Sequence, residues 1–116
     1  MSYQLTEGKY FGDLLNVRKD TYVHYSLTSY LPEEGIGKHT HENSYISILV
    51  KGAYAEVNKE GNMFLQPGNI IYRPAGCSHS NQFNLLGGIC FNIELKKNWQ
   101  EQFSDFTICA DCSNIS

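Results

Sequence analysis

The sequence predicts one all-β domain, a barrel or a sandwich, from its length, its strand pattern and its turn spacing. At 116 residues the chain is long enough for one hydrophobic core and too short for two. Its pattern is almost entirely one of short strands, without the alternating helices of an α/β protein. Glycine and proline interrupt the strands at regular intervals, as in domains that are built from hairpins.

Strands and turns are expected in the following order along the chain. The expected strands cover residues 22–30, 37–41, 45–51, 53–58, 62–65, 69–73, 80–83 and 88–95. The turns between them, at 51–52, 59–62, 66–69 and 74–76, contain glycine or proline, which supply the positive or fixed φ of a tight reversal.

Beyond Leu95 the pattern changes. Trp99 and Phe103 lie four residues apart on one face of a short helix, which we expect to pack on the outside of the barrel. Residues 107–116 are polar and serine-rich, without a capping signal or apolar periodicity. We therefore expect a barrel with its helix over residues 1–106, and a linker or tail over residues 107–116.

Composition limits the location and the partners of the chain. A net charge of -3 and a pI near 5.7 provide no positive field for nucleic acid, so no direct nucleic-acid contact is expected from these residues. No signal peptide and no stretch of about 20 apolar residues is visible, which argues against a membrane. Four irregularly placed cysteines then favour reduced thiols and a cytoplasmic location.

Three histidines carry the candidate chemistry. His39 and His41 are two residues apart in an expected strand, so both rings point to the same side of the sheet. His79 follows a glycine, a strand and a Pro-x-Gly turn. Three neutral imidazoles form one face of a coordination sphere and leave positions open for a ligand. The sequence therefore predicts a pocket that holds a divalent metal: zinc, nickel, iron or manganese.

Plainer interpretations of the histidines and cysteines remain. His39 and His41 are also compatible with ordinary strand positions whose rings are solvated or hydrogen-bonded. His24 has no partner at ligand spacing, which favours a structural role. Cys109 and Cys112 have the spacing of half a zinc site or of a redox pair, but no second pair accompanies them.

Four further side chains are candidates for binding a ligand: Tyr45, Tyr54, Tyr72 and Arg73. Tyrosines offer stacking faces and hydroxyl groups to a ligand cavity, although barrel filling or an interface is the commoner use. Tyr22 and Tyr25 have the same two interpretations: lining a ligand cavity, or filling the barrel or an interface. Arg73 could clamp an acidic ligand, or lie solvated at an edge of the sheet, which the pattern slightly favours.

These residues resemble the two sequence signatures of the cupin family. The second signature matches at four positions: Gly68, Pro74, Gly76 and His79. The first matches at three: His39, His41 and Gly52. Three positions depart from the family pattern, because Glu33 replaces a glycine, Tyr45 replaces a glutamate ligand, and Phe83 replaces an asparagine. The resemblance implies a double-stranded β-helix, or jelly-roll, barrel. It also implies a metal held more weakly than usual, or not at all, with Tyr45 a poor substitute for the carboxylate.

Residues 8–103 are similar, more specifically, to the N-terminal sensor domain of AraC-type transcription regulators. The similarity rests on a tyrosine-rich first strand pair, on Glu42 directly after the His-x-His pair, on the segment 44–54, and on the strand 88–95 before the helix that contains Trp99. In that family the cupin binds a small effector or dimerises, and a separate C-terminal domain binds DNA. The expected linker would lead to such a domain, which this chain does not contain.

Three functional hypotheses follow from the sequence. The first is a small-molecule sensing and dimerisation module of an AraC-type regulator, a homodimer that needs no catalysis. The second is a stand-alone metal-dependent cupin enzyme, of the dioxygenase or isomerase type, with the three histidines as ligands. The missing carboxylate and the lack of a second acid or base in the motifs count against the enzyme. The third is a module whose exposed strands and helix serve mainly dimerisation.

Overall fold

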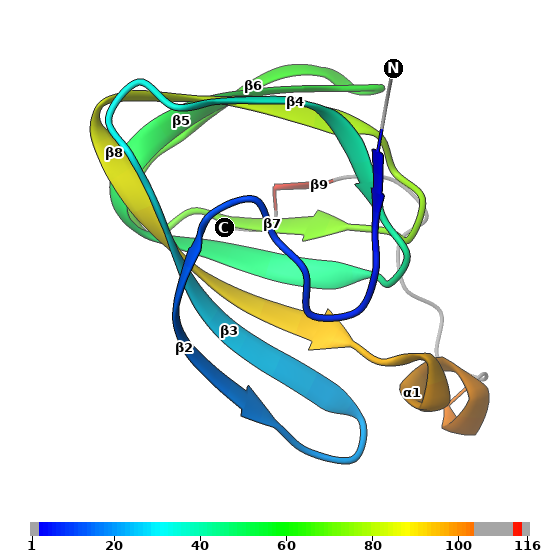
Figure 1. Ribbon diagram of the computed structural model, residues 1–116. Helices are drawn as coiled ribbons and strands as arrows, with labels where there is room; N and C mark the ends of the chain where they lie inside the picture. The colour runs from blue at the N-terminus through cyan, green and yellow to red at the C-terminus, as the bar shows by residue number, and fades with distance from the viewer. Residues whose placement is uncertain (1–2, 104–112, 115–116) are drawn as a thin grey trace.

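The computed structural model describes residues 3–103 and 113–114 (Figure 1). Nine strands and one short helix follow in the order β1 (Tyr3–Leu5), β2 (Asp13–Lys19), β3 (Val23–Tyr30), β4 (Gly35–His41), β5 (Tyr45–Asn58), β6 (Gly61–Leu65), β7 (Ile70–Arg73), β8 (His79–Leu95), α1 (Lys97–Gln102) and β9 (Ser113–Asn114). All nine strands belong to one sheet. The expected all-β fold with a short C-terminal helix is confirmed.

Two long antiparallel strands, β5 and β8, organise the sheet. They run together from the pair Tyr45 and Glu94 to the pair Asn58 and His79. The first part of β8 pairs with β4 and the second part with β3, while β5 pairs with β7 at its start and with β6 at its end. Each of the two long strands therefore pairs with one set of strands in its first half and with another set in its second half. The sheet curls round on itself as a result (Figure 1).

The curl depends on a glycine at the bend of β5. Gly52 has φ +87°, and a Cβ atom there would lie 1.9 Å from the carbonyl oxygen of Gly87 on β8. A side chain fits neither that backbone conformation nor that space. The register of β5 and β8 shifts on both sides of this point, as it does at β-bulges that bend a strand.

The bend corrects part of the expected strand pattern. Residues 45–51 and 53–58 form a single strand, as do 80–83 and 88–95, because the glycines bend the strands without ending them. The strands β1 and β2 were not expected. All seven residues of β2 are exposed, so the strand lacks the alternation of buried and exposed residues that sequence patterns detect.

The interior has an apolar part and a polar part. The apolar cluster consists of Ile36, Leu49, Tyr54, Leu65, Ile71, Phe83 and Cys90. Tyr30 packs against this cluster with its ring stacked on Phe83 at 4.4 Å. The buried polar side chains include the histidines of the expected pocket.

The helix α1 lies beside the start of β3, outside the barrel (Figure 1). The ring of Phe103, just beyond the helix, lies 5.3 Å from that of Tyr22, and Asn98 donates a hydrogen bond to the Thr21 carbonyl. Within residues 3–103 and 113–114, no helix has the length and apolar character needed to cross a membrane.

The expected linker and the cysteines can be followed only in part. Most of residues 107–116, with Cys109 and Cys112, lies outside the described residues, while Ser113–Asn114 forms β9, which pairs with β7. Cys90 is a buried free thiol. Cys77 takes part in a disulfide, so the expectation of reduced thiols is wrong at that residue.

Candidate metal centre

The rings of His39, His41 and His79 converge inside the barrel. His39 and His41 share one face of β4, and His39 is the cross-strand partner of His79 on β8, so all three rings meet on the inner face. One nitrogen from each ring lies within 4.8 Å of the other two. The three residues are 3%, 5% and 2% exposed, so this is an interior site.

The protonation of the rings suits metal binding. The Nδ1 atom of His39 lies 2.9 Å from the Gly37 carbonyl, and that of His79 lies 3.4 Å from the Cys77 carbonyl. A carbonyl only accepts hydrogen bonds, so these contacts place the proton on Nδ1 and the lone pair on Nε2 of His39 and of His79. Burial lowers the pKa of all three histidines, and that of His41 falls to about 3, with the charges of His39 and Arg73 adding to the effect. The neutral form, which is the metal ligand, is therefore favoured at neutral pH.

Tyr45 lies beside the histidines, at the position where the cupin signature has a glutamate. Its hydroxyl is 3.3 Å from Nε2 of His79 and accepts a 3.0 Å hydrogen bond from Arg73. Burial raises the pKa of this hydroxyl well above its usual value, and the Arg73 charge only partly offsets that. The phenol is therefore neutral and donates to His79, so a cation would have to replace this hydrogen bond at the same nitrogen.

Arg73 is buried in the barrel and forms an ion pair with Glu56. Arg73 is 4% exposed and Glu56 is fully buried. The guanidinium donates to both carboxylate oxygens of Glu56 and, at 2.9 Å, to the hydroxyl of Tyr54. Asn58 and Asn81 donate to the same carboxylate, each at 2.8 Å. The slight preference for Arg73 as a solvated edge residue is therefore wrong, because β7 directs this side chain inward.

The cavity next to the histidines is small, at about 30 Å³. Its walls include Tyr45, Tyr54 and Arg73 of the predicted ligand-binding set. A volume of this size holds roughly one water molecule or the coordinating group of a small ligand.

Tyr72 does not line this cavity, which corrects the prediction for that residue. Ile71 and Arg73 point into the barrel, and side chains alternate along a strand, so Tyr72 points to the outer face of β7. Tyr22 and Tyr25 also lie away from the cavity: Tyr22 packs against Phe103, and Tyr25 stacks on Phe91.

Residues ahead of β2 cover the histidines. The ring of Phe11 lies 4.9 Å from that of His39, and the ring of Tyr10 lies 5.1 Å from that of His41. The Tyr10 hydroxyl donates to Glu94, a buried carboxylate that also accepts hydrogen bonds from Asn43 and from the backbone of Gly8. The sequence did not point to this cover, since neither Tyr10 nor Phe11 belongs to a motif.

Glu56 is the other functional residue that sequence reasoning missed. The alternation in the segment from Tyr54 to Asn58 places Tyr54, Glu56 and Asn58 on one face of β5. Which face that is depends on the strand register, and a shift of one residue reverses it. The burial of the Glu56 carboxylate therefore cannot be predicted until the register of β5 is known.

Two departures from the cupin signature have local explanations. Glu33, where the signature has a glycine, adopts φ +61°, the left-handed conformation that favours glycine. Phe83, where the signature has an asparagine, packs in the apolar cluster between Tyr30 and Tyr54. Glu33 therefore holds a backbone conformation that glycine adopts readily, and Phe83 contributes to the apolar core.

The donor set fits a divalent cation. Three imidazoles suit zinc, copper, iron and nickel, and the group of nearby ligand atoms found in the described part of the chain contains no carboxylate. A cation bound here would have open positions toward the cavity.

Comparison with known proteins supports the fold. No family model matches the sequence, and no curated protein is significantly similar to it. A cupin domain from Bordetella pertussis is 24% identical and superposes with a TM-score of 0.55 over 77% of this chain and 99% of its own. KdgF from Halomonas sp. is 15% identical, with a TM-score of 0.62 over 72% of this chain and 79% of its own. Oxalate decarboxylase from Bacillus subtilis, described with Mn(II) centres, is 16% identical, with a TM-score of 0.59 over 70% of this chain and 23% of its own. At these identities the likeness shows the cupin fold.

Proposed function

We propose that this chain is a metal-dependent, ligand-sensing cupin module that serves as the regulatory part of an AraC-type transcription regulator. In this proposal His39, His41 and His79 hold one divalent cation, and a small-molecule effector occupies its open positions. The observation that carries the proposal is the convergence of three buried, neutral imidazoles on one point inside the barrel.

Charge balance indicates what kind of ligand would bind. Three neutral imidazoles leave the charge of a divalent cation uncompensated, and Arg73 is already neutralised by Glu56. A buried net charge is costly unless it is paired. A small anion, such as a carboxylate, therefore suits the open positions better than a neutral ligand.

Sensing is preferred over catalysis because the acidic and basic groups near the histidines are already engaged. Glu56 accepts hydrogen bonds from Arg73, Asn58 and Asn81, and Tyr45 is a neutral phenol. A general base needs a free lone pair within hydrogen-bond reach of the substrate. The regulator role rests on the sequence resemblance and on the net charge of -3, which leaves DNA binding to another domain.

The second candidate is a small metal-dependent enzyme of the dioxygenase or isomerase type. It is favoured by the fold that the chain shares with oxalate decarboxylase and by the open positions of the histidine site. When bound, the cation would act as a Lewis acid on a coordinated oxygen atom. The residues of this chain would then position the substrate between Tyr45, Tyr54 and Arg73.

Metal binding is tested first. Metal-free protein is mixed with Zn²⁺, Ni²⁺, Mn²⁺ or Fe²⁺, dialysed, and its metal content is measured by elemental analysis. We expect one equivalent of at least one of these ions in the wild type and none in His41→Ala. His24→Ala, which removes a buried histidine outside the site, should retain the metal. Equal metal content in His41→Ala and wild type would remove the basis of the proposal.

The two candidate functions are separated by the fate of the ligand. Metal-loaded protein is heated with acetate, oxalate or benzoate while NMR follows each compound. A sensor is stabilised, by about 2.7 kcal/mol at a ligand concentration one hundred times the Kd, and leaves the compound unchanged. Conversion of the compound, absent from His41→Ala, would favour the enzyme instead.

A further inference from the structure

A hollow of about 540 Å³ lies outside the barrel, next to the end of β5 and the start of β8. Val57 of β5 and Ser80 of β8 line it and are cross-strand partners. Their neighbours Asn58 and His79 are buried, so the alternation along both strands turns Val57 and Ser80 outward. His79 also contributes to the lining of this hollow. The sheet therefore lies between the hollow and the rings of the three histidines.

The charged side chains that line this hollow are both basic. Lys38 lies on β4 directly before the buried His39, so alternation turns it outward, and Lys59 follows the end of β5. Among the lining residues that the structure describes, none is acidic. The chain as a whole has a net charge of -3, so a basic lining is opposite to its overall balance. The local field of the hollow therefore favours an anion.

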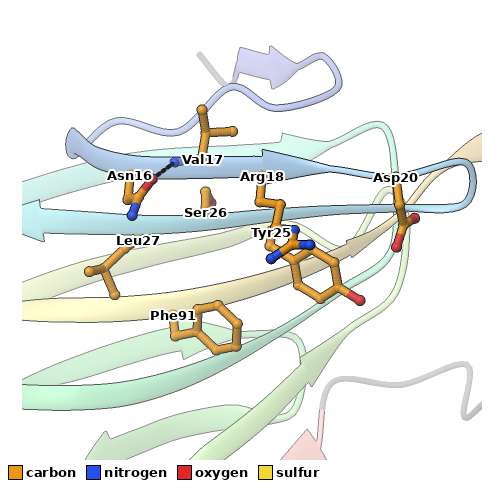
Figure 2. A pocket seen from close by; sticks show the side chains of 8 residues that line it. All are labelled: Asn16, Val17, Arg18, Asp20, Tyr25, Ser26, Leu27 and Phe91. Atoms are coloured by element: carbon orange, nitrogen blue, oxygen red, sulfur yellow. Dashed lines mark hydrogen bonds between the residues drawn. The ribbon is translucent and has the colours of Figure 1, made fainter.

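A larger hollow elsewhere on the molecule shows the contrast. It has a volume of about 650 Å³ and is lined by residues of β2, β3 and β8 (Figure 2). Arg18 and Asp20 both line it, so its two charges balance each other. Of these two hollows, only the one that Lys38 and Lys59 line has a net charge with which to select a ligand.

The hydroxyl of Ser78 adds a polar group that lacks a partner. Ser78 is half-buried and lines the basic hollow, and its Oγ atom is buried and forms no hydrogen bond within the described residues. Buried polar atoms in native proteins nearly always have a partner, so an unpaired hydroxyl calls for an explanation. A serine side chain has three staggered rotamers, and an anion in the hollow would give its hydroxyl an acceptor.

We propose that this hollow binds the phosphate group of a small phosphorylated molecule, through Lys38, Lys59 and Ser78. A phosphate monoester carries a charge of about -1.5 to -2 at neutral pH and has three acceptor oxygens, which match two ammonium groups and one hydroxyl. Lysine binds phosphate as a point charge, whereas a carboxylate has a single charge and suits the planar fork of arginine better. Val57 and Pro74 provide apolar surface for the carbon part of the ligand.

A small molecule fits the hollow better than a nucleic acid. Its volume of about 540 Å³ lies within the range of about 300 to 1,000 Å³ that is typical of small-molecule pockets. A nucleic acid needs an extended surface with many lysines and arginines, which a chain with a net charge of -3 does not favour. The inference rests on the shape and the charge of this hollow, and it holds whether or not the histidines bind a metal.

The test titrates the whole chain with α-glycerol phosphate, inorganic phosphate or glycerol at constant ionic strength, while NMR follows the amide signals. The protein is first freed of metal, so that phosphate bound to a cation at the histidines does not contribute. We expect the signals of Lys38, Lys59 and Ser78 to move with both phosphates, with a Kd of about 1 mM or below for the ester. Glycerol, which lacks the charge, should leave them unchanged.

Variants assign the binding to the three side chains. Lys38→Gln and Lys59→Gln replace exposed residues and should each raise the Kd about three- to tenfold, whereas Lys19→Gln, on β2 outside the hollow, should leave it within about twofold of wild type. Ser78→Ala should weaken binding without lowering the free energy of unfolding, because it removes a hydroxyl that has no partner.

Three results would overturn the proposal. The first is no binding of either phosphate at about 10 mM, a concentration well above the expected Kd. The second is binding of glycerol as tight as that of its phosphate, which would show that the charge is not recognised. The third is an unchanged Kd in the double variant of Lys38→Gln and Lys59→Gln, which would place the phosphate elsewhere on the molecule.

Discussion

The buried ion pair of Arg73 and Glu56 determines the polarity of the interior around the histidines. Burial opposes ionisation of the Glu56 carboxyl, but Arg73 and hydrogen bonds from Asn58 and Asn81 hold its pKa below the usual value. The pair is surrounded by tyrosine hydroxyls and amides, so nearly every polar atom near it has a partner. A buried ion pair of this kind contributes little net stability. Removing one partner is strongly destabilising, because the other charge then stays buried without a counter-charge.

Replacing Glu56 by Gln should destabilise the protein. The substitution leaves a buried guanidinium without its counter-charge, for which we expect a loss of about 3 to 5 kcal/mol in the free energy of unfolding. Urea denaturation measures the change, and Glu101→Gln, an exposed glutamate on α1, is the control with an expected change of less than about 0.5 kcal/mol. The double variant Glu56→Gln with Arg73→Met should be more stable than Glu56→Gln alone. A loss below about 1 kcal/mol in Glu56→Gln would contradict the ion pair.

The neutral histidines predict that metal-free protein loses stability in mild acid. Burial, the charge of His39 and that of Arg73 lower the pKa of His41 to about 3, whereas an unfolded histidine titrates near 6.5. Between these values the unfolded chain binds the additional proton, so the free energy of unfolding falls as the pH falls from 6.5 and is unaffected above it.

His41→Gln tests this by removing one titrating group. Urea denaturation between about pH 4 and pH 6 should give a slope against pH that is smaller by about 1.4 kcal/mol per pH unit than in wild type. Parallel stability curves for the two proteins would show that His41 is protonated in the folded state.

The strands β5 and β8 bend where glycine allows a close approach. Gly52→Ala should cost more than the conformational strain of a positive φ, because the new Cβ would also collide with the Gly87 carbonyl. Gly68→Ala is the matched control, since Gly68 has φ +92° but open space around its Cβ position. We expect a loss of about 1 kcal/mol at Gly68 and at least about 3 kcal/mol at Gly52, measured by urea denaturation. Equal losses would show that the two strands separate easily at the bend.

The same bends limited what the sequence could predict about the strands. Glycine at position 52 indicates a positive φ, but the sequence alone does not show whether the strand ends there or bends and continues. At Gly61 and Gly68 the chain does turn, as expected. β2 escaped detection for another reason, since an edge strand exposed on both faces carries no periodic pattern.

The sequence motifs were sufficient to predict the histidines of the candidate site, but not the residues around them. The spacing of His39 and His41 and the signature around His79 were sufficient to predict a shared pocket, because period-2 alternation needs no tertiary information. The inward direction of Arg73, the outward direction of Tyr72 and the burial of Glu56 all depend on which face of each strand is inside. That choice is made by pairing across the whole sheet, which short motifs do not encode.

At the scale of the whole molecule, the interior combines an apolar cluster with a polar network around the histidines. Seven of the side chains that face inward near the histidines are polar and buried: Ser26, Thr28, Ser47, Glu56, Arg73, Asn92 and Glu94. Ser47, Asn92, Ser26 and Thr28 form one hydrogen-bonded chain across β5, β8 and β3. Each of these four side chains has a hydrogen-bond partner, so the chain leaves none of these buried groups unpaired.

The central claim is that three imidazoles bind one cation, and X-ray absorption spectroscopy of protein loaded with one equivalent of Zn²⁺ tests it most directly. The account predicts three imidazole nitrogens at about 2.0 to 2.1 Å from the metal. His79→Ala should reduce the number to two. A spectrum with one imidazole or none in the wild type would show that the cation binds elsewhere and would contradict the account.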